Sequence, residues 1–541
     1  MQRATAFAAD RSGPFARVTD ALGAATDRQL ALLVGALLFV LAAWPLLLVD
    51  YPPFQDLPNH LAAVTIIEHP ALYPDFVFNG LLKTNSSLYA WLLFLGPAIG
   101  TRLAAKLFVL LVLALGAVAY PRFVLSFGGR KRMLVSALFA WPMVHSWFVS
   151  TGMLDFAIAV PLATLLLVLL NAQRQRATNA RALVLAALGL LVWYAHVFPL
   201  LVVFLLAGVH VVTRRGWAAR WGEAKLLLVP FAPSAVLVAG SVWAHATEPQ
   251  GAMTGFVSLG RTLPAWELFY NLWAEWFWSF TKLEILTVVP CVALGLWAIY
   301  RSRDEVPFFG PLAMALLAAL YVFTPYVATN WFHVNSRFIP FLWLGALART
   351  PERLPRRWMA WGLVACALVT AAGMGVDYRR LDADRARFTA GMSHVPEGAT
   401  LLPLVFRSKG SSENTRSLLH AWGYYVVEKH TSAPLLFAHS KSFALTYREP
   451  PDVQFNHLVL ESFAPSMGSP DWMCDLLRSG GVALKDCDGQ WQAAWRDFWA
   501  EATPRFDHVL LWSAPDAVLP FVPPAYHVVF KRDELTILER R

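Results

Sequence analysis

The sequence predicts a mostly α-helical protein that crosses a membrane many times and ends in a small α/β domain. Of its 541 residues, 57% are apolar and 15% are charged, whereas soluble domains have roughly 45–50% and 25%. The mean hydropathy is +0.48, and the apolar runs are too long and too numerous for water-facing domains. These values exclude a soluble enzyme, a disordered chain and a fibrous protein.

Membrane spans are expected wherever about 20 consecutive residues are apolar. The first run, 30–49, follows Arg3, Arg11, Arg17 and Arg28, which predicts a cytoplasmic N-terminus. A cleaved signal peptide is the alternative, but the run is long and no small-x-small cleavage site closes it. We expect about eleven spans in all, the others being 103–125, 133–150, 153–171, 181–196, 197–213, 225–245, 283–300, 308–328, 338–348 and 358–376.

The distribution of charge sets the expected orientation. The net charge is +9, and the excess of Lys and Arg lies before Asp377, because the tail from Asp377 onward has a net charge of −2. The predicted inner side carries 21 Lys and Arg residues and the predicted outer side, before the tail, carries six. This asymmetry predicts an inner N-terminus and an outer C-terminal domain. It also argues against a nucleic-acid partner.

Three regions are predicted. Residues 1–28 form a cytoplasmic segment, 29–376 form the transmembrane domain with a long first outer loop at 50–86, and 377–541 form a periplasmic α/β domain. In this last domain we expect buried strands at 401–406 and 508–512, a hairpin of 527–530 and 535–539, and a helix over 413–430. The apolar segment 88–99 is too short to cross the membrane.

The chain has four cysteines, and two of them lie in the tail. A disulfide between Cys474 and Cys487 is expected if the tail is periplasmic. Two free buried thiols are the alternative. A zinc site is less favoured because the tail has no matching second pair.

Polar residues are densest just after the first span, in the segment Tyr51-Pro-Pro-Phe-Gln-Asp-Leu-Pro-Asn-His60. Its prolines restrict the backbone that carries Asp56. A carboxylate at a membrane surface can deprotonate a hydroxyl group if its surroundings tune it. The alternative is that Asp56 caps a helix that begins near Pro58.

These features resemble the GT-C class of integral-membrane glycosyltransferases, which have an inner N-terminus, one span and then a long outer loop with an early Asp. The segment Ser87-Leu-Tyr-Ala-Trp-Leu-Leu and the following Thr101-Arg-Leu-Ala-Ala-Lys are similar to the "PPLYYWLL…RL" stretch of the bacterial relatives of protein mannosyltransferase and the aminoarabinose lipid A transferase. Ser336-Arg-Phe-Ile-Pro is similar to their "RYLLP" element. Within this class, the chain resembles bacterial membrane proteins with a "DLPNH" loop.

The resemblance implies a polyprenyl-phosphate-linked sugar as donor and an envelope acceptor, on the outer face of a bacterial inner membrane. It implies that Asp56 is the catalytic base. Many members have a paired acidic motif in this loop, but Asp56 is followed by Leu57, which leaves the use of a divalent metal open. Asp155, at the outer end of the fourth predicted span, is the candidate second catalytic carboxylate, since an ionisable group there is costly unless it is used. The alternative for Asp155 is a helix cap.

Six residues are candidates for substrate binding. Arg337 can hold the departing lipid phosphate through two parallel hydrogen bonds, although an arginine that reaches toward lipid headgroups is the alternative. The weaker candidates are Lys83 and Arg102 for phosphate, and His60, His196 and His333 for substrate.

We therefore expect an inverting glycosyltransferase that uses a lipid-linked sugar amid membrane lipids. The sequence has no P-loop and no Gly-x-Gly-x-x-Gly motif, which disfavours a nucleotide-sugar donor. A membrane transporter is one alternative, although the sequence shows no duplicated halves. A non-catalytic envelope assembly protein is the other. An enzyme requires an outer cavity that contacts both Asp56 and Arg337.

Overall fold

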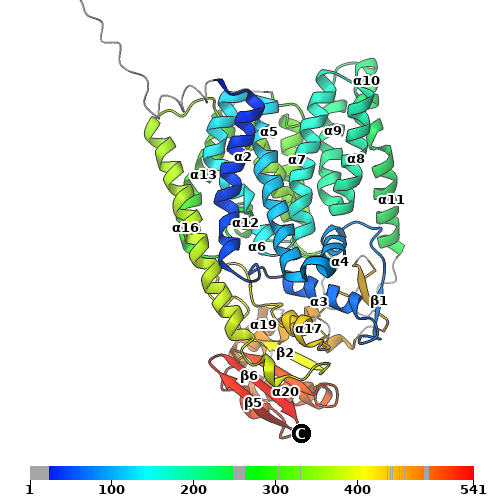
Figure 1. Cartoon of the computed structure of the whole chain (residues 1–541), viewed down its shortest axis with the longest axis vertical. Helices are drawn as coiled ribbons and strands as arrows, with labels where there is room; N and C mark the ends of the chain where they lie inside the picture. The colour runs from blue at the N-terminus through cyan, green and yellow to red at the C-terminus, as the bar shows by residue number, and fades with distance from the viewer. Residues whose placement is uncertain are drawn as a thin grey trace, which may run out of the picture.

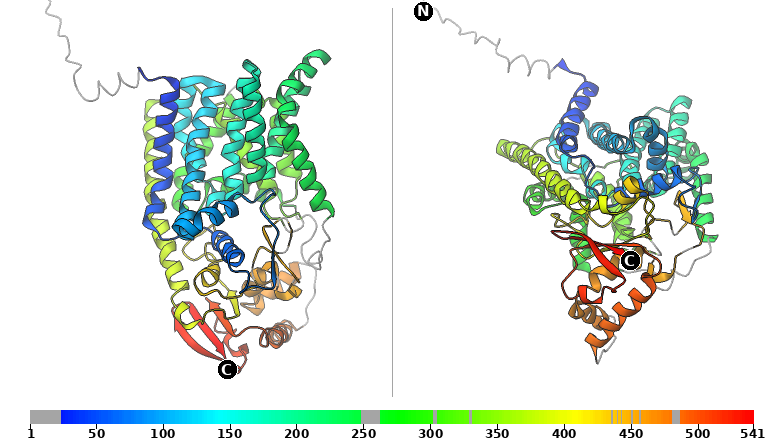
Figure 2. Two further views of the ribbon diagram at one scale, coloured as in Figure 1. Left: turned by 45° about the vertical axis from the view of Figure 1, so that its right-hand side comes forward. Right: turned by 60° about the horizontal axis from the view of Figure 1, so that its bottom comes forward.

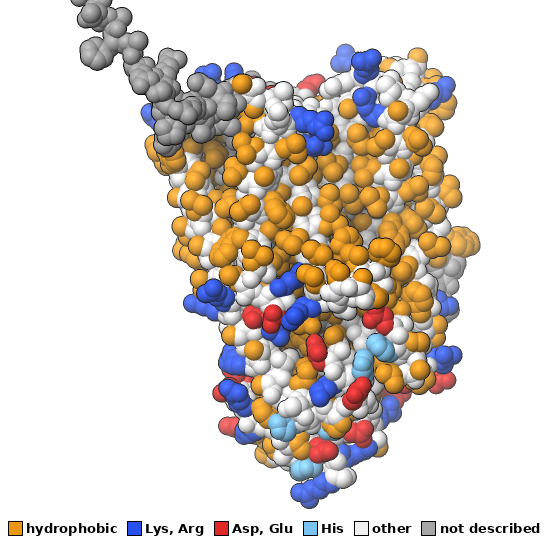
Figure 3. Space-filling model, viewed as in Figure 1, with side chains coloured by type: hydrophobic (Ala, Val, Ile, Leu, Met, Phe, Trp, Pro, Cys, Tyr) orange, Lys and Arg blue, Asp and Glu red, His pale blue; other side chains and the backbone are white. Residues whose placement is uncertain are grey.

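The computed structural model has a bundle of long helices at one end and a smaller mixed α/β domain at the other (Figure 1). It describes residues 24–541 except 248–261, 302–304, 329–330, 435, 439, 442, 450, 456 and 480–485. A broad band of hydrophobic side chains covers the bundle, and Lys and Arg gather at the end farthest from the C-terminal domain (Figure 3). This distribution is typical of a membrane protein.

The bundle contains helices that vary widely in length. Within the described ranges, five are long and apolar enough to cross a membrane, and the bent pair α12–α13 is a sixth candidate. The multi-pass prediction is therefore confirmed, whereas the count of eleven and the orientation stay predictions. The helices of the bundle are α2 (Asp27–Ala43), α5 (Thr101–Val144), α7 (Leu154–Gln175), α8 (Asn179–Ala195), α9 (Val197–Val212), α10 (Trp217–Leu227), α11 (Ala232–Thr247), α12 (Ala265–Phe277), α13 (Lys282–Arg301), α14 (Pro311–Phe323), α15 (Ile339–Leu347) and α16 (Arg357–Phe388).

Two glycines explain how the first helices pack. Helix α5 bends at Gly129, whose φ of +78° is outside the helical range, so its two halves correspond to the predicted spans 103–125 and 133–150. Helix α2 begins with a capping box between Thr26 and Gln29. It then lies close to α5, because a Cβ atom on Gly35 would be only 3.0 Å from the carbonyl oxygen of Ala117. Small residues allow such close contact between membrane helices.

The segment 50–86, predicted to be the first outer loop, folds against the C-terminal domain. It contains α3 (Leu57–Glu68) and β1 (Phe76–Phe78), and α4 (Ser87–Ile99) follows it. Strand β1 pairs antiparallel with β3 (Leu445–Tyr447) of the tail. Helix α3 packs on α17 (Gly423–Lys429) so closely that a Cβ atom on Gly423 would lie 2.4 Å from the carbonyl oxygen of Pro58. The loop therefore lies between the bundle and the C-terminal domain (Figure 2).

The C-terminal domain is built on a four-stranded sheet with the order β2-β4-β6-β5. The strands are β2 (Leu401–Val405), β4 (His508–Trp512), β5 (Tyr526–Arg532) and β6 (Leu535–Arg540). Strand β2 is parallel to β4, and β6 is antiparallel to both β4 and β5. All residues of β2 and β4 are buried, as their continuous apolar sequences predict. The prediction of a small α/β tail is thus confirmed at the level of a mixed sheet.

Helices complete this domain and join it to the bundle. They are α17, α18 (His457–Ser466), α19 (Pro470–Ser479) and α20 (Cys487–Ala502), and a disulfide between Cys474 and Cys487 joins the last two, with their Cα atoms 6.1 Å apart. Helix α16 continues unbroken through residue 377 into the domain. The chain therefore has no flexible linker at the predicted boundary.

The helix expected over 413–430 is much shorter than predicted, since α17 begins only at Gly423. The residues before it bind the turn between α12 and α13 instead: the amides of Glu413 and Thr415 donate to the carbonyls of Phe280 (2.8 Å) and Ser279 (3.3 Å). These bonds to the bundle take the place of helical hydrogen bonds.

Candidate active site

A cavity of about 1130 Å³ lies between the bundle and the C-terminal domain. This volume includes open solvent at the mouth of the cavity. Six of the eight candidate catalytic and substrate-binding residues line it, namely Asp56, Asp155, His60, His196, His333 and Arg337. The topology of the chain thus brings together residues from the first outer loop, α7, the α8–α9 turn and the segment before α15.

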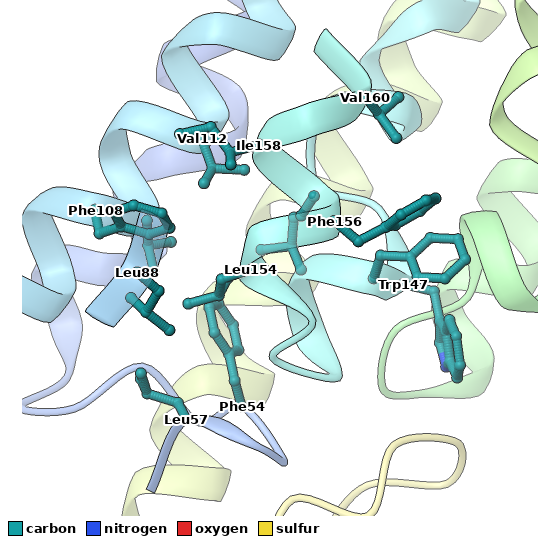
Figure 4. Packing of buried hydrophobic residues seen from close by; sticks show 14 of the residues in the cluster. Phe54, Leu57, Leu88, Phe108, Val112, Trp147, Leu154, Phe156, Ile158 and Val160 are labelled. Carbon is teal, nitrogen blue, oxygen red and sulfur yellow. The ribbon is translucent and has the colours of Figure 1, made fainter. Parts of the chain in front are cut away.

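The loop that carries Asp56 is held by tightly packed apolar side chains. Phe54 and Leu57 flank Asp56 in sequence and are fully buried. Figure 4 shows them among the residues of one hydrophobic cluster, together with Leu88 of α4, Phe108 of α5 and Leu154 of α7. This packing fixes the loop that carries Asp56.

Backbone contacts fix Asp56 further. Its amide donates to the carbonyl of Thr151 (3.0 Å), and the amide of Gln55 donates to that of Ser150 (3.3 Å). Asp56 occupies the N-cap position of α3, yet its carboxylate accepts no hydrogen bond from that helix. The alternative in which Asp56 serves as a helix cap is therefore wrong.

The carboxylate of Asp56 instead faces a histidine of the C-terminal domain. Nδ1 of His420 lies 3.1 Å from Oδ1 of Asp56, and Nε2 of His420 donates to Oε1 of Glu461 at 2.8 Å. Burial raises the pKa of Asp56, but the hydrogen bond from His420 and its charge outweigh burial, so that the pKa is lowered. Burial lowers the pKa of His420, but Glu461 and Asp56 together raise it to about 9. The geometry therefore favours an ionised Asp56 beside a protonated His420.

His60 is the other histidine near Asp56. Its ring nitrogen Nδ1 is hydrogen-bonded to the hydroxyl of Tyr89 at 2.9 Å. Burial lowers the pKa of His60 to about 4, although the charge of Asp56 acts in the opposite direction. The neutral ring of His60 thus adds no charge to this wall of the cavity.

Asp155 has a structural contact in addition to its place in the cavity wall. Its Oδ1 accepts hydrogen bonds from the hydroxyl of Ser87 and from the amide of Leu88 (2.9 Å). These donors belong to the first turn of α4, where a carboxylate is favourable. Asp155 therefore anchors α4 beside the cavity.

Arg337 lies on the side of the cavity formed by the bundle. It is 9% exposed, and among the described residues no carboxylate lies within ion-pair distance of its guanidinium. The guanidinium carbon lies 5.8 Å from the ring centre of Phe156 and 5.5 Å from that of Trp331. Its Nη1 lies 3.3 Å from Nε2 of His196, and its Nε has no hydrogen-bond partner. A buried cation without a counter-ion is suited to bind an anion.

Aromatic rings connect Arg337 with His420 along the cavity. Trp331 stacks on Phe443, with ring centres 5.8 Å apart, and Phe443 stacks on Phe437 at 6.0 Å. Phe437 then meets the ring of His420 edge-on at 5.0 Å. This wall gives the cavity a flat apolar side between its cation and its carboxylate.

His333 also lines the cavity. Its Nδ1 is 3.0 Å from Oε1 of Glu275 and 2.7 Å from the hydroxyl of Tyr326. Ser336 donates to the same carboxylate of Glu275. This network links α12 to the segment that carries Arg337.

The structure places Lys83 and Arg102 outside the cavity. The ammonium of Lys83 donates to the carbonyls of Lys441 (2.8 Å) and Phe443 (3.2 Å). Arg102 pairs with Asp50 at 3.6 Å, and both side chains are exposed. Lys83 thus holds the segment that bears Phe443, while Arg102 is a surface residue in the first turn of α5.

Within the described ranges, no three His, Cys, Asp or Glu side chains are placed to hold a metal ion together. Both ring nitrogens of His420 are engaged in hydrogen bonds. The described residues of the cavity therefore do not fit a divalent metal.

Sequence reasoning missed His420, Glu461 and the aromatic wall. These residues belong to the C-terminal domain or to the segment before α15, and no motif surrounds them. A useful signal was the tail's HAWGYY segment, in which a histidine precedes a run of aromatic residues.

Comparison with known proteins identifies the fold. No family model and no curated sequence match the chain. The structure is similar to the crystal structure of ArnT from Cupriavidus metallidurans in the apo state, with a TM-score of 0.51 and 12% sequence identity over 94% of this chain and 97% of that one. It is also similar to the cryo-EM structure of the mycobacterial arabinofuranosyltransferase AftD (mutant R1389S), with a TM-score of 0.50 and 13% identity over 95% of this chain and 42% of that one.

The fold of this chain is therefore similar to the folds of ArnT and AftD. At these identities the likeness concerns the fold and not the substrate. It supports the prediction of a mostly helical membrane bundle with a small C-terminal α/β domain.

Proposed function

We propose that this protein is an inverting glycosyltransferase that moves a sugar from a polyprenyl-phosphate donor to a hydroxyl group of an envelope acceptor on the periplasmic face. The observation that carries the proposal is that Asp56 and Arg337 line one cavity between the bundle and the C-terminal domain. The ArnT-like fold supports a lipid-linked donor.

In this mechanism the acceptor hydroxyl attacks the anomeric carbon of the donor sugar. Asp56 takes the proton of the hydroxyl as the new C–O bond forms. The bond between sugar and phosphate breaks, and the polyprenyl phosphate leaves with its electron pair. Arg337 offsets the negative charge that develops on this phosphate. One displacement inverts the configuration of the anomeric carbon, and no strong general acid is needed because the phosphate is a good leaving group.

The geometry disfavours the two other functions. A secondary transporter typically has its substrate site near the midplane of the membrane, in discontinuous helices, whereas this cavity includes His420 and Glu461 of the C-terminal domain. A non-catalytic assembly protein has no need for an ionised carboxylate that is buried without a capping role. Asp56 is such a carboxylate.

The decisive experiment is the substitution Asp56→Asn. Purified protein in lipid nanodiscs is incubated with radiolabelled prenyl-phosphate sugars and envelope extracts. Loss of the base should lower the rate of transfer about 10²–10⁴-fold. Asp50→Asn is the matched control, since Asp50 lies six positions earlier on the same loop and its side chain is 64% exposed. Among the described residues, Asp50 pairs with the exposed Arg102 and, at 4.0 Å, with Arg385. Equal transfer by Asp56→Asn and Asp50→Asn would refute the role of Asp56.

A further inference from the structure

We propose that the C-terminal domain completes the active site, with His420 and Glu461 as positioning residues that keep Asp56 ionised and direct it toward the acceptor hydroxyl. This inference rests on the proposed function. It assigns a role in catalysis to a domain whose sequence carries no recognisable motif.

The hydrogen bonds of His420 define its protonation state. Its Nδ1 lies 3.1 Å from Oδ1 of Asp56 and 3.1 Å from the carbonyl oxygen of Gln55, and its Nε2 lies 2.8 Å from Oε1 of Glu461. All three partners are acceptors when the carboxylates are ionised. A neutral imidazole has one bare nitrogen, which would face an oxygen lone pair. The arrangement is therefore satisfied by an imidazolium ion between two carboxylates.

Because these three side chains are buried, the ionisation of Asp56 depends strongly on the neighbouring His420. The side chain of His420 is 2% exposed, and those of Asp56 and Glu461 are 11% and 12% exposed. An isolated carboxylate at the position of Asp56 would tend to become protonated, and a protonated carboxylic acid cannot act as a base. The adjacent cation reverses this tendency, and Glu461 in turn stabilises the cation.

The remaining titratable groups nearby do not replace this cation. His60 of α3 faces Asp56 but is held neutral by burial. His457 of α18 is separated from His420 by the ring of Phe437, which contacts both histidines edge-on. Arg416 lines the cavity, but the residue is exposed. Among the groups facing Asp56, His420 is thus the buried cation in direct contact.

Asp56 remains available to the acceptor in this arrangement. Its Oδ1 accepts from the side-chain amide of Gln55 (3.1 Å) as well as from His420. Both contacts involve the same oxygen, so the other oxygen, Oδ2, is the atom that would take the proton. Two donors on one oxygen restrict rotation of the carboxylate, which is how the C-terminal domain would orient the base.

The test compares the pH dependence of kcat/KM for wild type, His420→Gln and Glu461→Gln with the radiolabelled prenyl-phosphate sugars. In His420→Gln the acid limb should move up by about 1–3 pH units, because Asp56 loses its neighbouring cation. In Glu461→Gln the basic limb should move down by about 1–3 pH units, because His420 loses the charge that keeps it protonated. Glu461→Asp should restore the profile in part.

Glu397→Gln is the matched control. Glu397 also faces a histidine of the C-terminal domain, at 4.0 Å from His430, but its side chain is 73% exposed and lies outside the cavity. The pH dependence of kcat/KM for Glu397→Gln should match that of wild type. Profiles for His420→Gln and Glu461→Gln that have the wild-type shape and only a lower amplitude would overturn the proposal, because a structural role alone lowers the amount of active enzyme.

A spectroscopic measurement separates this proposal from the proposed function. NMR of isotope-labelled histidine in the full-length protein, with His420→Gln to assign the signal, reports the titration of His420 directly. A titration near pH 9 that falls in both Glu461→Gln and Asp56→Asn supports the ionic chain even if no sugar is transferred. A titration near 6.5 that neither variant changes would overturn the proposal even if Asp56 proves to be the base.

Discussion

Gly152 packs directly against the backbone of Asp56. A Cβ atom at Gly152 would lie 2.8 Å from the amide nitrogen of Asp56 and 2.9 Å from that of Leu57. The φ angle of Gly152 is +83°, a value that side chains disfavour. The turn before α7 therefore needs glycine for two independent reasons, its conformation and its contact with the loop that carries Asp56.

We predict that Gly152→Ala impairs transfer more than it impairs folding. Gly216 provides the control, because its φ of +84° is nearly the same but no atom lies within 4 Å of its Cβ position. Both substitutions should cost roughly 1–3 kcal/mol in backbone strain, because a side chain disfavours a positive φ. Only Gly152→Ala should also displace Asp56, and a shift of about 1 Å can reduce the rate about 10²-fold. Thermal melting and transfer assays on the two variants measure these effects; equal rates would show that the contact has no catalytic importance.

We also predict that replacing Arg337 lowers kcat far more than replacing Arg102 does, although both were candidate phosphate ligands in the sequence. Arg337→Gln should lower kcat by about 10²–10³, the loss expected when one stabilising group for a developing charge is removed. Arg337→Lys should be intermediate, since lysine keeps the charge but not the planar pair of donors. Arg102→Gln should stay close to wild type because Arg102 pairs with exposed Asp50. Steady-state kinetics with varied donor concentration test the ranking, which an inactive Arg102→Gln would contradict.

The sequence was sufficient to group the cavity residues that lie at the ends of predicted spans. Asp56 follows the first span and Arg337 precedes a late one, so the alternation of spans places both on the outer side. Their actual contact with one cavity depends on the packing of the bundle. The same reasoning failed for Lys83 and Arg102, because predicted topology gives the side of the membrane but not the direction of a side chain.

His420 and Glu461 could not be predicted as site residues from the sequence. They are separated from Asp56 by more than 360 and 400 positions, and only the docking of the tail on the outer loop brings them to it. The apolar spacing of 413–430 predicted a longer helix, whereas the amides of Glu413 and Thr415 bind the bundle. A periodicity argument cannot include such partners, because they lie in another domain.

Lys83 should act on the aromatic wall and not on the phosphate. Replacing it by Met removes two hydrogen bonds to the carbonyls of Lys441 and Phe443. Because Lys83 is partly exposed, we expect a loss of about 1 kcal/mol in local stability, which corresponds to about fivefold faster hydrogen exchange in β3. KM for the donor should rise, with little change in kcat.

Lys282→Met is the control for Lys83→Met. Lys282 is also predicted to lie near the outer side, but its side chain is 79% exposed and its ammonium lies 3.7 Å from Glu413. Hydrogen exchange in β3 should be unchanged in this variant. If Lys83→Met lowered kcat and left exchange unchanged, a direct role of Lys83 in catalysis would be indicated instead.

The contact between Asp56 and His420 should also make stability depend on pH, with opposite signs at the two ends. The pKa of His420 is raised from 6.5 to about 9, so its contribution is complete below about pH 6.5 and is lost as the pH rises through 9. The pKa of Asp56 is lowered, so its contribution is present above about pH 4 and is lost as the pH falls below that value. The Tm of wild type should therefore decline between pH 6.5 and 9. In Glu461→Gln the decline should be smaller, because His420 then titrates nearer its ordinary pKa. A decline of the same size in both proteins would mean that other groups control the alkaline instability.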